Sequence, residues 1–377
     1  MYKINVGKFD FLWGVIIEEN MTVEETHQTV YTITYSISSV IHIYQKVYPN
    51  QMVTKDFING EVGNFDWKLS GLIDRSFPFQ YTYGSSITLT TELAPLSSEN
   101  IDYTKIIQLG GAYINKITNP VGQKAIIIPN QLGGSDVKGI TNSLTDSVFV
   151  NKNEVAYIAL AATANDNFEL IGSRAFYNEA NLKQVFVPGN GLTRIGASAF
   201  ANSGLTSFNI KANLGNISAT AFNNTQNLMN FTVSATNTKF KAVNGVLYSK
   251  DGEKLVHLPA GRTGTYKVKE GTKTIGENAI YLPNIDKLIL PNSLKTINYS
   301  GIRIKDMEYL VIPASVTHII SRGIIDDDEY SPLDLKVYVN LTAAPATWED
   351  MWAFDIDEIH YLPSWEYDAN GDPVLKP

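Results

Sequence analysis

A short pattern of apolar and polar positions recurs through the middle of the chain. It consists of an apolar residue, two free positions, an apolar residue, one free position and a final apolar residue. The closing alternation has the two-residue period of a β-strand, so its two apolar side chains point to one face and the residue between them points to the other. A following proline ends the strand because it cannot donate a backbone hydrogen bond. The copies are LKQVFVP (182–188), LTSFNIK (205–211), LMNFTVS (228–234), IDKLILP (285–291) and MEYLVIP (307–313).

A second motif of six residues alternates with these strands. It starts with isoleucine, continues with glycine or small residues, and ends with phenylalanine or isoleucine. The leading isoleucines are 24, 22, 58, 22 and 22 residues apart, and a period in the twenties is typical of a leucine-rich-repeat solenoid. We expect parallel strands to stack, with one apolar column inside and tight helical or irregular turns between strands. The copies are IGSRAF (171–176), IGASAF (195–200), ISATAF (217–222), IGENAI (275–280), INYSGI (297–302) and IISRGI (319–324).

Together these motifs resemble the BspA-type leucine-rich repeat, in which a strand ending in proline precedes Ile-Gly and a small-residue run ending in Ala-Phe. The resemblance covers roughly residues 105–363, beginning with an opening repeat at 124–140. It includes 231–276, which is similar to the extended hairpin repeat of that family. Here Asp251-Gly252 between two alternating runs predicts a hairpin, because glycine accepts a positive φ. The last repeats replace phenylalanine with isoleucine, a swap of similar size that keeps the column filled.

The predicted fold is mainly β with short helical turns: a right-handed, parallel leucine-rich-repeat solenoid that follows a small antiparallel β-sandwich-like domain. Residues 1–104 lack the repeat and alternate β-branched and aromatic residues with polar ones, as in TVYTITYSI (29–37). We expect them to act as an anchor, cap or assembly domain. Residues 105–363 form the solenoid, with a hairpin insertion near 240–260, and 364–377 form a tail. Trp348, Trp352 and Phe354 are expected to cover the end of the column, which would otherwise be exposed.

Charge and composition exclude several classes of partner. The net charge of −8 disfavours binding to nucleic acid or to anionic lipid. The absence of cysteine excludes disulfides and thiolate chemistry. No apolar run reaches the roughly 18 residues of a membrane span. The apolar run at 11–17, bounded by Asp10 and Glu18, predicts a strand rather than the core of a signal peptide.

Residues that could carry catalysis or bind a metal are scattered. The five histidines, at 27, 42, 257, 318 and 360, have no metal-ligand spacing, and no catalytic or phosphate-binding motif is present. The acidic run at 326–329 predicts a solvated loop. Asp368 to Asp372 resemble a fragment of a calcium loop that lacks the closing glutamate, so we expect a polar turn. The sequence therefore predicts no catalytic residue, no metal site and no cofactor. A glycosidase with two carboxylates stays a third alternative.

The outward-pointing strand residues are the candidate binding site. Stacked strands align these residues into one concave face, and aromatic, amide and hydroxyl groups suit a protein or glycan ligand. The candidate ligand-binding residues are Gln184, Phe186, Ser207, Asn209, Asn230, Thr232, Lys287, Ile289, Tyr309, Val311, Lys336 and Tyr338.

The resemblance implies a non-enzymatic binding or adhesion protein of a bacterial cell surface, which presents the concave face to host proteins, cells or glycans. We expect a cell-surface or extracellular location. The alternative is a structural or attachment component of a virion or assembly in gut bacteria or their phages. In that case residues 1–104 would anchor the protein in the assembly, and the chain could self-associate through this domain. The location would then be a virion or the cytoplasm. The missing signal-peptide pattern motivates this alternative.

Overall fold

The computed structural model describes residues 95–106, 110–121, 125–141, 143, 146–160, 168–187, 189–326 and 335–377, together with the backbone of seven strands before residue 92. These seven strands pair antiparallel as β1–β2–β7, β3–β4 and β5–β6. The sandwich-like domain predicted at 1–104 lies largely outside the described residues and stays a prediction. The strands are β1 (Thr22–His27), β2 (Val30–Ser36), β3 (His42–Tyr48), β4 (Gln51–Asp56), β5 (Val62–Lys68), β6 (Ser76–Thr82) and β7 (Ser86–Thr91).

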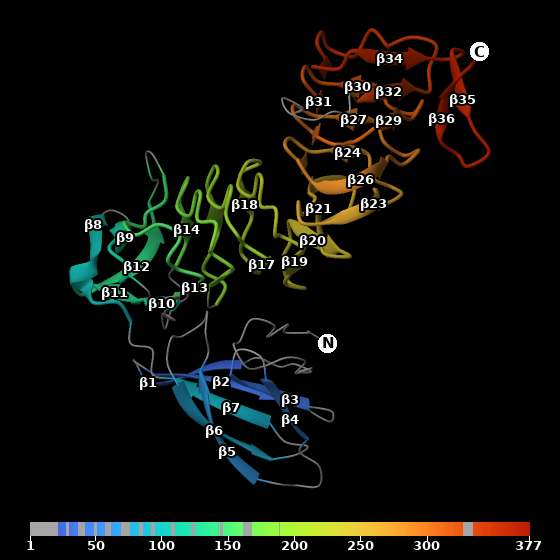
Figure 1. Ribbon diagram of the computed structural model, residues 1–377. Helices are drawn as coiled ribbons and strands as arrows, with labels where there is room; N and C mark the ends of the chain where they lie inside the picture. The colour runs from blue at the N-terminus through green and yellow to red at the C-terminus, as the bar shows by residue number, and fades with distance from the viewer. Residues whose placement is uncertain are drawn as a thin grey trace.

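The first half of the solenoid, from residue 95 to 233, has strands on two sides of each coil (Figure 1). One side is a sheet in the order β18–β16–β14–β12–β9–β8, and the other carries the parallel strands β10–β13–β15 and β17–β19. The elements of the first side are η1 (Ser98–Asn100), β8 (Ile101–Ile106), β9 (Gly111–Ile117), β11 (Gln131–Leu132), β12 (Ser135–Ile140), β14 (Leu170–Ile171), β16 (Arg194–Ile195) and β18 (Asn216–Ile217). Those of the second side are β10 (Ala125–Ile128), β13 (Tyr157–Leu160), β15 (Gln184–Phe186), β17 (Ser207–Ile210) and β19 (Asn230–Val233).

A hairpin repeat of three antiparallel strands follows: β20 (Phe240–Val243), β21 (Val246–Ser249) and β22 (Lys254–His257). The hairpin predicted at Asp251-Gly252 joins β21 to β22, with Gly252 at φ +84°. A second turn at Asn244 and Gly245 joins β20 to β21, and both of its residues also have positive φ. Glycine and asparagine occupy these positions because they tolerate left-handed backbone conformations.

The second half, from residue 258 onward, has strands on three sides of each coil. The motif isoleucines form one sheet with β22, and three further parallel sheets on the other two sides complete the coils. The strands are β24 (Thr274–Ile275), β27 (Thr296–Ile297) and β30 (His318–Ile319); β25 (Ile280–Tyr281), β28 (Ile302–Ile304), β31 (Ile324–Asp326) and β33 (Ala353–Phe354); and β23 (Thr263–Lys267), β26 (Asn284–Ile289), β29 (Tyr309–Ile312), β32 (Lys336–Val339) and β34 (Glu358–Tyr361). A last antiparallel hairpin is formed by β35 (Trp365–Tyr367) and β36 (Pro373–Leu375).

The predicted mainly-β solenoid of stacked parallel strands is confirmed. The small-residue segments form hydrogen-bonded turns, and the described residues contain no α-helix. The phenylalanines stack as expected: the ring centroids of Phe176 and Phe200, and those of Phe200 and Phe222, are 5.3 Å apart, and all three side chains are buried. Trp348 is buried at the far end of the column beside Trp352, with ring centroids 4.7 Å apart, as predicted for the terminal cover.

Most of the six-residue motifs contain a left-handed position that the sequence pattern alone did not indicate. The fourth residue has positive φ in five of the six copies. This conformation turns the chain toward the next strand, and it is unfavourable for branched residues. The residues are Arg174, Ser198, Asn278, Ser300 and Arg322, with φ between +48° and +57°.

A short ladder of asparagine amides runs beside these turns. Asn202 donates to Asn178 and Asn224 donates to Asn202, both at 2.8 Å, and all three residues have positive φ. Asparagine serves both needs, because it tolerates the left-handed region and its side chain can both donate and accept.

The expectation of a solvated loop at the acidic run 326–329 is wrong for its first residue. Asp326 does not lie in a solvated loop: it is buried, and its carboxylate accepts a hydrogen bond from the Leu335 amide at 3.0 Å. Residues 327–329 of the same acidic run are outside the described residues.

At the start of the solenoid, Leu96 packs into the core and β8 extends across residue 104. The solenoid sheet therefore includes residues on both sides of the predicted boundary.

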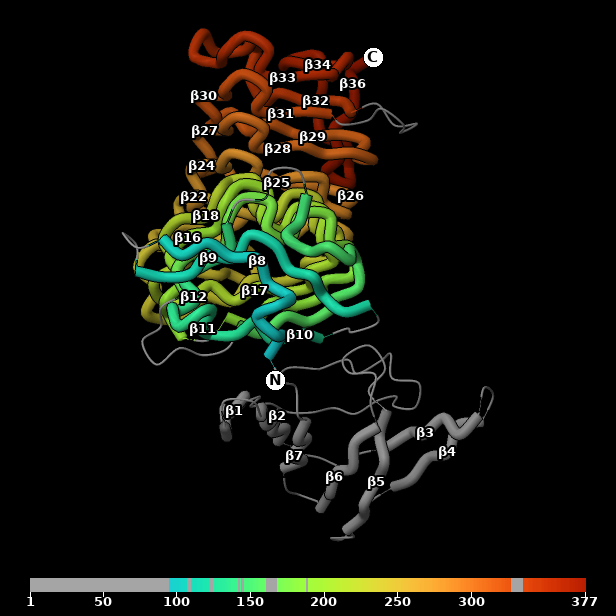
Figure 2. The backbone as a smooth tube through the Cα atoms, turned by 90° about the vertical axis from the view of Figure 1, so that its left-hand side faces the viewer, coloured from blue at the N-terminus to red at the C-terminus, as the bar shows by residue number. Residues whose placement is uncertain are grey.

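The solenoid changes direction at the hairpin repeat. In Figure 2 the coils of the first half are seen nearly along their stacking direction, while those of the second half rise from bottom to top. The buried apolar residues accordingly form two clusters that meet at β21, where Leu247 belongs to the first and Val246 to the second. The bend interrupts the column without exposing it, since both residues are buried.

A histidine is buried at this bend. His257 lies 5.8 Å from the ring of Phe222 and 5.6 Å from that of Phe231, measured between centroids. Its Nε2 atom has no hydrogen-bond partner. Burial in this apolar site lowers the pKa of His257 from 6.5 to about 4, so the ring is neutral near pH 7.

We expect His257 to make the fold sensitive to acid. Its folded pKa lies below its unfolded pKa, so the unfolded chain binds a proton first and stability is lost as the pH falls from about 6.5 toward 4. The difference corresponds to roughly 3 kcal/mol in the free energy of unfolding. Urea unfolding followed by circular dichroism across this pH range should show a shallower loss for His257→Leu than for the wild type. The matched control is His318→Leu at an exposed position, which should keep the wild-type profile. Parallel profiles for His257→Leu and the wild type would contradict this role.

Candidate ligand-binding face

The predicted site residues lie in register on neighbouring strands. We call the surface formed by the outward residues of β15, β17, β19, β23, β26, β29, β32 and β34 the ladder face. On it Ser207 is paired with Asn230, and Asn209 with Thr232. The residues between them in the strands, such as Phe208, are buried in the core. The strand alternation read from the sequence therefore places these side chains on the side away from the core.

The ladder face continues in the second half with the same register. Tyr309 is paired with Lys336, and Val311 with Tyr338. The hairpin repeat separates this group from the first, so the twelve predicted residues form two groups of six rather than one row. Gln184, Asn209, Asn230 and Ile289 are exposed, Tyr338 is buried, and the remaining seven are half-buried: Phe186, Ser207, Thr232, Lys287, Tyr309, Val311 and Lys336.

Sequence reasoning missed four members of the ladder face. Thr265 and Lys267 of β23 are in register with Lys287 and Ile289, and Glu358 and His360 of β34 are in register with Lys336 and Tyr338. The alternation in TGTYK (263–267) was a signal for strand β23. However, the segment does not match the repeat pattern, because Thr263 stands where the pattern has its first apolar residue.

The first group is open and lines two shallow depressions. One, of about 380 Å³, is lined by Asn190, Asn209, Lys211, Thr232, Val233 and Ser234. The other, of about 340 Å³, is lined by Met229, Asn230, Arg262, Thr263, Thr265 and Tyr266. Both combine amide and hydroxyl groups with one cationic side chain. In addition, the Lys211 ammonium lies 5.5 Å from the centroid of the Phe186 ring, a cation–π contact that holds an aromatic surface next to the first depression.

The second group is covered in part by the β35–β36 hairpin. Trp365 lies over Tyr338, with ring centroids 5.5 Å apart, and its Nε1 donates to the Val339 carbonyl at 3.1 Å. The Asp372 carboxylate accepts hydrogen bonds from Lys287, at 2.6 Å, and from the Tyr309 hydroxyl. The tail residues predicted to form a polar turn do form one, but this turn docks on the ladder face. Tyr338 is therefore not available to an external ligand in this conformation.

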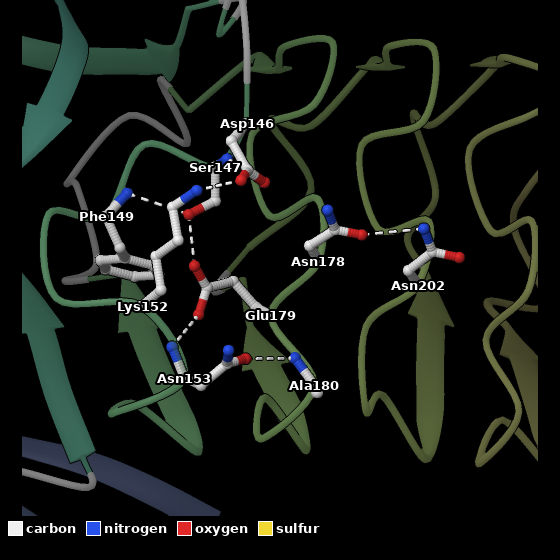
Figure 3. A network of polar contacts seen from close by, with 9 residues as sticks. All are labelled: Asp146, Ser147, Phe149, Lys152, Asn153, Asn178, Glu179, Ala180 and Asn202. Atoms are coloured by element: carbon white, nitrogen blue, oxygen red, sulfur yellow. Dashed lines mark hydrogen bonds and ion pairs between the residues drawn. The ribbon is translucent and has the colours of Figure 1, made fainter.

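One buried carboxylate, that of Glu179, lies outside the ladder face. Glu179 is only 1% exposed, and burial raises its pKa. Figure 3 shows that its oxygens accept from the Ser147 hydroxyl and from the Asn153 amide, the latter at 2.8 Å. The Asn153 side chain in turn accepts from the Ala180 amide at 2.6 Å. These contacts connect residues 147–153 to the coil that contains Glu179, so Glu179 acts as a structural clasp between the two segments.

The other candidate metal ligands of the described residues are histidine and acidic side chains. Among these residues, no three histidine or acidic side chains are placed to hold a metal ion. His360 approaches Glu358 at 3.3 Å on the exposed side of β34, and His318 approaches its neighbour Thr317 at 2.9 Å. The side chains of His27 and His42 are outside the description. Also among the described residues, no helix has the length and apolar character needed to cross a membrane.

We expect Glu179→Ala to destabilise the first half by about 1–3 kcal/mol, because it leaves the Asn153 amide without its acceptor and opens space in the clasp. Urea unfolding measures the loss. The matched control is Glu169→Ala, which removes a half-exposed carboxylate paired with Lys138 at 3.1 Å and should cost less than about 1 kcal/mol. Equal losses in the two variants would show that Glu179 is not a clasp.

Comparison with known proteins agrees with this repeat architecture. The family model described as "BspA type Leucine rich repeat region" matches six copies over residues 138–243 and 263–324. No curated protein sequence matches the chain significantly.

Solved structures with a similar course are bacterial leucine-rich-repeat proteins. One from Bacteroides ovatus is 15% identical, with a TM-score of 0.41 over 70% of this chain and 75% of that one. One from Eubacterium ventriosum is 16% identical, with a TM-score of 0.39 over 73% and 97%. The pneumococcal vaccine antigen PcpA is 16% identical, with a TM-score of 0.36 over 71% and 100%. These similarities are too low to bear on function, so the assignment rests on the repeat match and the stacked coils. Residues 138–243 and 263–324 of this chain match the BspA-type leucine-rich repeat.

Proposed function

We propose that this chain is a non-enzymatic binding or adhesion protein of a bacterial cell surface and that the ladder face contacts its ligand. The observation that carries the proposal is the open first group, where exposed Gln184, Asn209 and Asn230 stand on adjacent parallel strands. These amides can both donate and accept hydrogen bonds, which suits a protein backbone or the hydroxyls of a glycan.

The rigidity of the strands favours binding by this face. Its side chains project from strands that each pair with at least one neighbouring strand and are backed by a buried core, so little backbone ordering is lost when a ligand binds. The Phe186 ring under Lys211 supplies an apolar contact surface with a positive charge above it. A ligand that presents polar groups along an extended stretch would match the depression lined by Asn209 and Thr232 and the one lined by Asn230 and Arg262.

The proposed location is the cell surface or the extracellular space, as is typical of this repeat family. The alternative, an attachment component of a virion or assembly, depends on residues 1–104 and stays a prediction. Self-association through those residues belongs to the same alternative.

We expect Asn209→Trp to weaken ligand binding at least tenfold, because the indole would fill the depression that Asn209 lines. Binding would be measured by surface plasmon resonance against the ligands identified from arrays of host matrix proteins and glycans. The matched control is Asn227→Trp, which also replaces an exposed asparagine but lies in the turn before β19. If the Asn209 variant retains full affinity for every ligand that binds the wild type, the ladder face is not the binding site.

Location separates the two functions directly. We expect peptides of this chain in the fraction released by protease treatment of intact source cells, identified by mass spectrometry. Their detection only in phage particles or cytosol would exclude the adhesin function and favour the assembly alternative.

A further inference from the structure

The β35–β36 hairpin is built to present one carboxylate. Its strands pair in the register Trp365 to Leu375 and Tyr367 to Pro373. The Asp368 side chain closes the turn by accepting from the amides of Asn370, at 2.8 Å, and Asp372, at 2.9 Å. Asp368 therefore shapes the turn from within, while the carboxylate of Asp372 points to the ladder face.

Two donors of the ladder face converge on that carboxylate. Lys287 of β26 and Tyr309 of β29 both donate to the same Asp372 oxygen. The Lys287 ammonium also lies 5.3 Å from the centroid of the Tyr309 ring, which holds it in place. The hydrogen bonds to Lys287 and to Tyr309 lower the pKa of Asp372, and the bond to Asp372 raises the pKa of Lys287, so both groups are charged over a wide pH range. A cationic and a neutral donor aimed at one point form a carboxylate site.

An aromatic platform lies beside the carboxylate site. Tyr338 is 5.5 Å from the indole of Trp365 and 5.1 Å from the ring of His360, measured between centroids. Trp365 is 1% exposed, whereas Tyr367 and Leu375 of the same hairpin are 51% and 52% exposed. The hairpin thus buries one large aromatic anchor, a kind of group that carries much of the binding energy at protein interfaces, and pairs one half-exposed carboxylate beside it.

The hairpin contacts the ladder face mainly through side chains. Among the described strands, β35 and β36 pair only with each other and add no strand to the sheet of β29, β32 and β34. A two-stranded hairpin is marginally stable alone, so this one depends on the docking. The Lys287–Asp372 pair is about one third exposed on the lysine and 42% on the aspartate, and exposed ion pairs are weak. The hairpin can therefore be displaced without unfolding the coils beneath it.

We propose that Lys287, Tyr309 and Tyr338 form a recognition site for an acidic, aromatic peptide turn, and that the β35–β36 hairpin occupies this site within its own chain. An external protein that offers a carboxylate beside a large aromatic side chain would bind by displacing the hairpin. The inference rests on the proposed function in taking the ladder face as a binding surface. It assigns a class of partner to the second group of that face, namely a protein with a carboxylate beside a large aromatic side chain. The β35–β36 hairpin competes with that partner within the chain.

The test uses the full chain and a labelled peptide of residues 364–377, SWEYDANGDPVLKP. The double variant Trp365→Ala, Asp372→Asn releases the chain's own hairpin while keeping every coil. We expect it to bind the peptide, by fluorescence anisotropy, at least tenfold more tightly than the wild type does. Asp372→Asn alone, a change at a half-exposed position, should give a smaller gain in affinity. If the double variant loses its cooperative melt, the single variant decides the question.

Specificity is tested on both partners. A peptide carrying Asp372→Asn should bind at least tenfold more weakly, and so should the double variant with Lys287→Met added. The matched control adds Lys295→Met, an exposed lysine outside the ladder face, and should bind the peptide as the double variant does. Absence of saturable binding, or binding indifferent to Asp372 and Lys287, would overturn the proposal. Binding of an oligogalacturonate in place of the peptide would also overturn it and assign the carboxylate site to acidic glycans.

The probe is the chain's own peptide, so the result does not depend on the external ligand. Peptide binding together with an unaffected Asn209→Trp variant would remove the proposed role of the first group and keep the recognition site. If that variant loses ligand binding and no peptide binding is found, the proposed role of the first group is kept and the recognition site is removed.

Discussion

Burial of one apolar column is the constraint on which the rest of this structure depends. No single coil can bury its own apolar residues, so each coil is stable only between two neighbours. Phe176, Phe200 and Phe222 express this constraint, because each ring packs on the ring of the next coil. The stacking that fills the column also forces the strands into register. The outward side chains are aligned as a consequence, which is how a packing requirement produces the ladder face.

Where the regular stacking of coils is interrupted, polar side chains are buried. At the bend, β20–β22 replace a regular coil, and the column is closed by His257 between Phe222 and Phe231, at the cost of an unpaired buried nitrogen. At a second such place, the buried carboxylate of Glu179 joins its coil to residues 147–153 through hydrogen bonds. Both residues titrate away from their ordinary pKa values because they are buried. Their perturbed pKa values reflect architecture, and neither residue opens on a depression of the ladder face.

The two groups of the ladder face are not equivalent. The first is open and polar, with amides exposed beside Lys211 and Arg262. The second is covered by a hairpin that supplies an indole and a carboxylate. The same chain thus carries an open surface and a covered one, and the covered surface contacts an indole and a carboxylate of its own chain.

The sequence by itself determined the stacked strands, the apolar column, the hairpin turn at Asp251-Gly252 and the register of the outward residues. The strands, the column and the register follow from local periodicity, which most copies of the repeat display, and the hairpin follows from the turn chemistry of Asp-Gly. It could not reveal the left-handed position of Arg174 and Arg322, because arginine carries no preference for that conformation. Only the tertiary structure decided that the solenoid bends at β21 and that Asp372 meets Lys287, which is 85 residues away in the sequence. Such contacts join segments without a shared pattern, and their geometry arises only when the coils have been stacked.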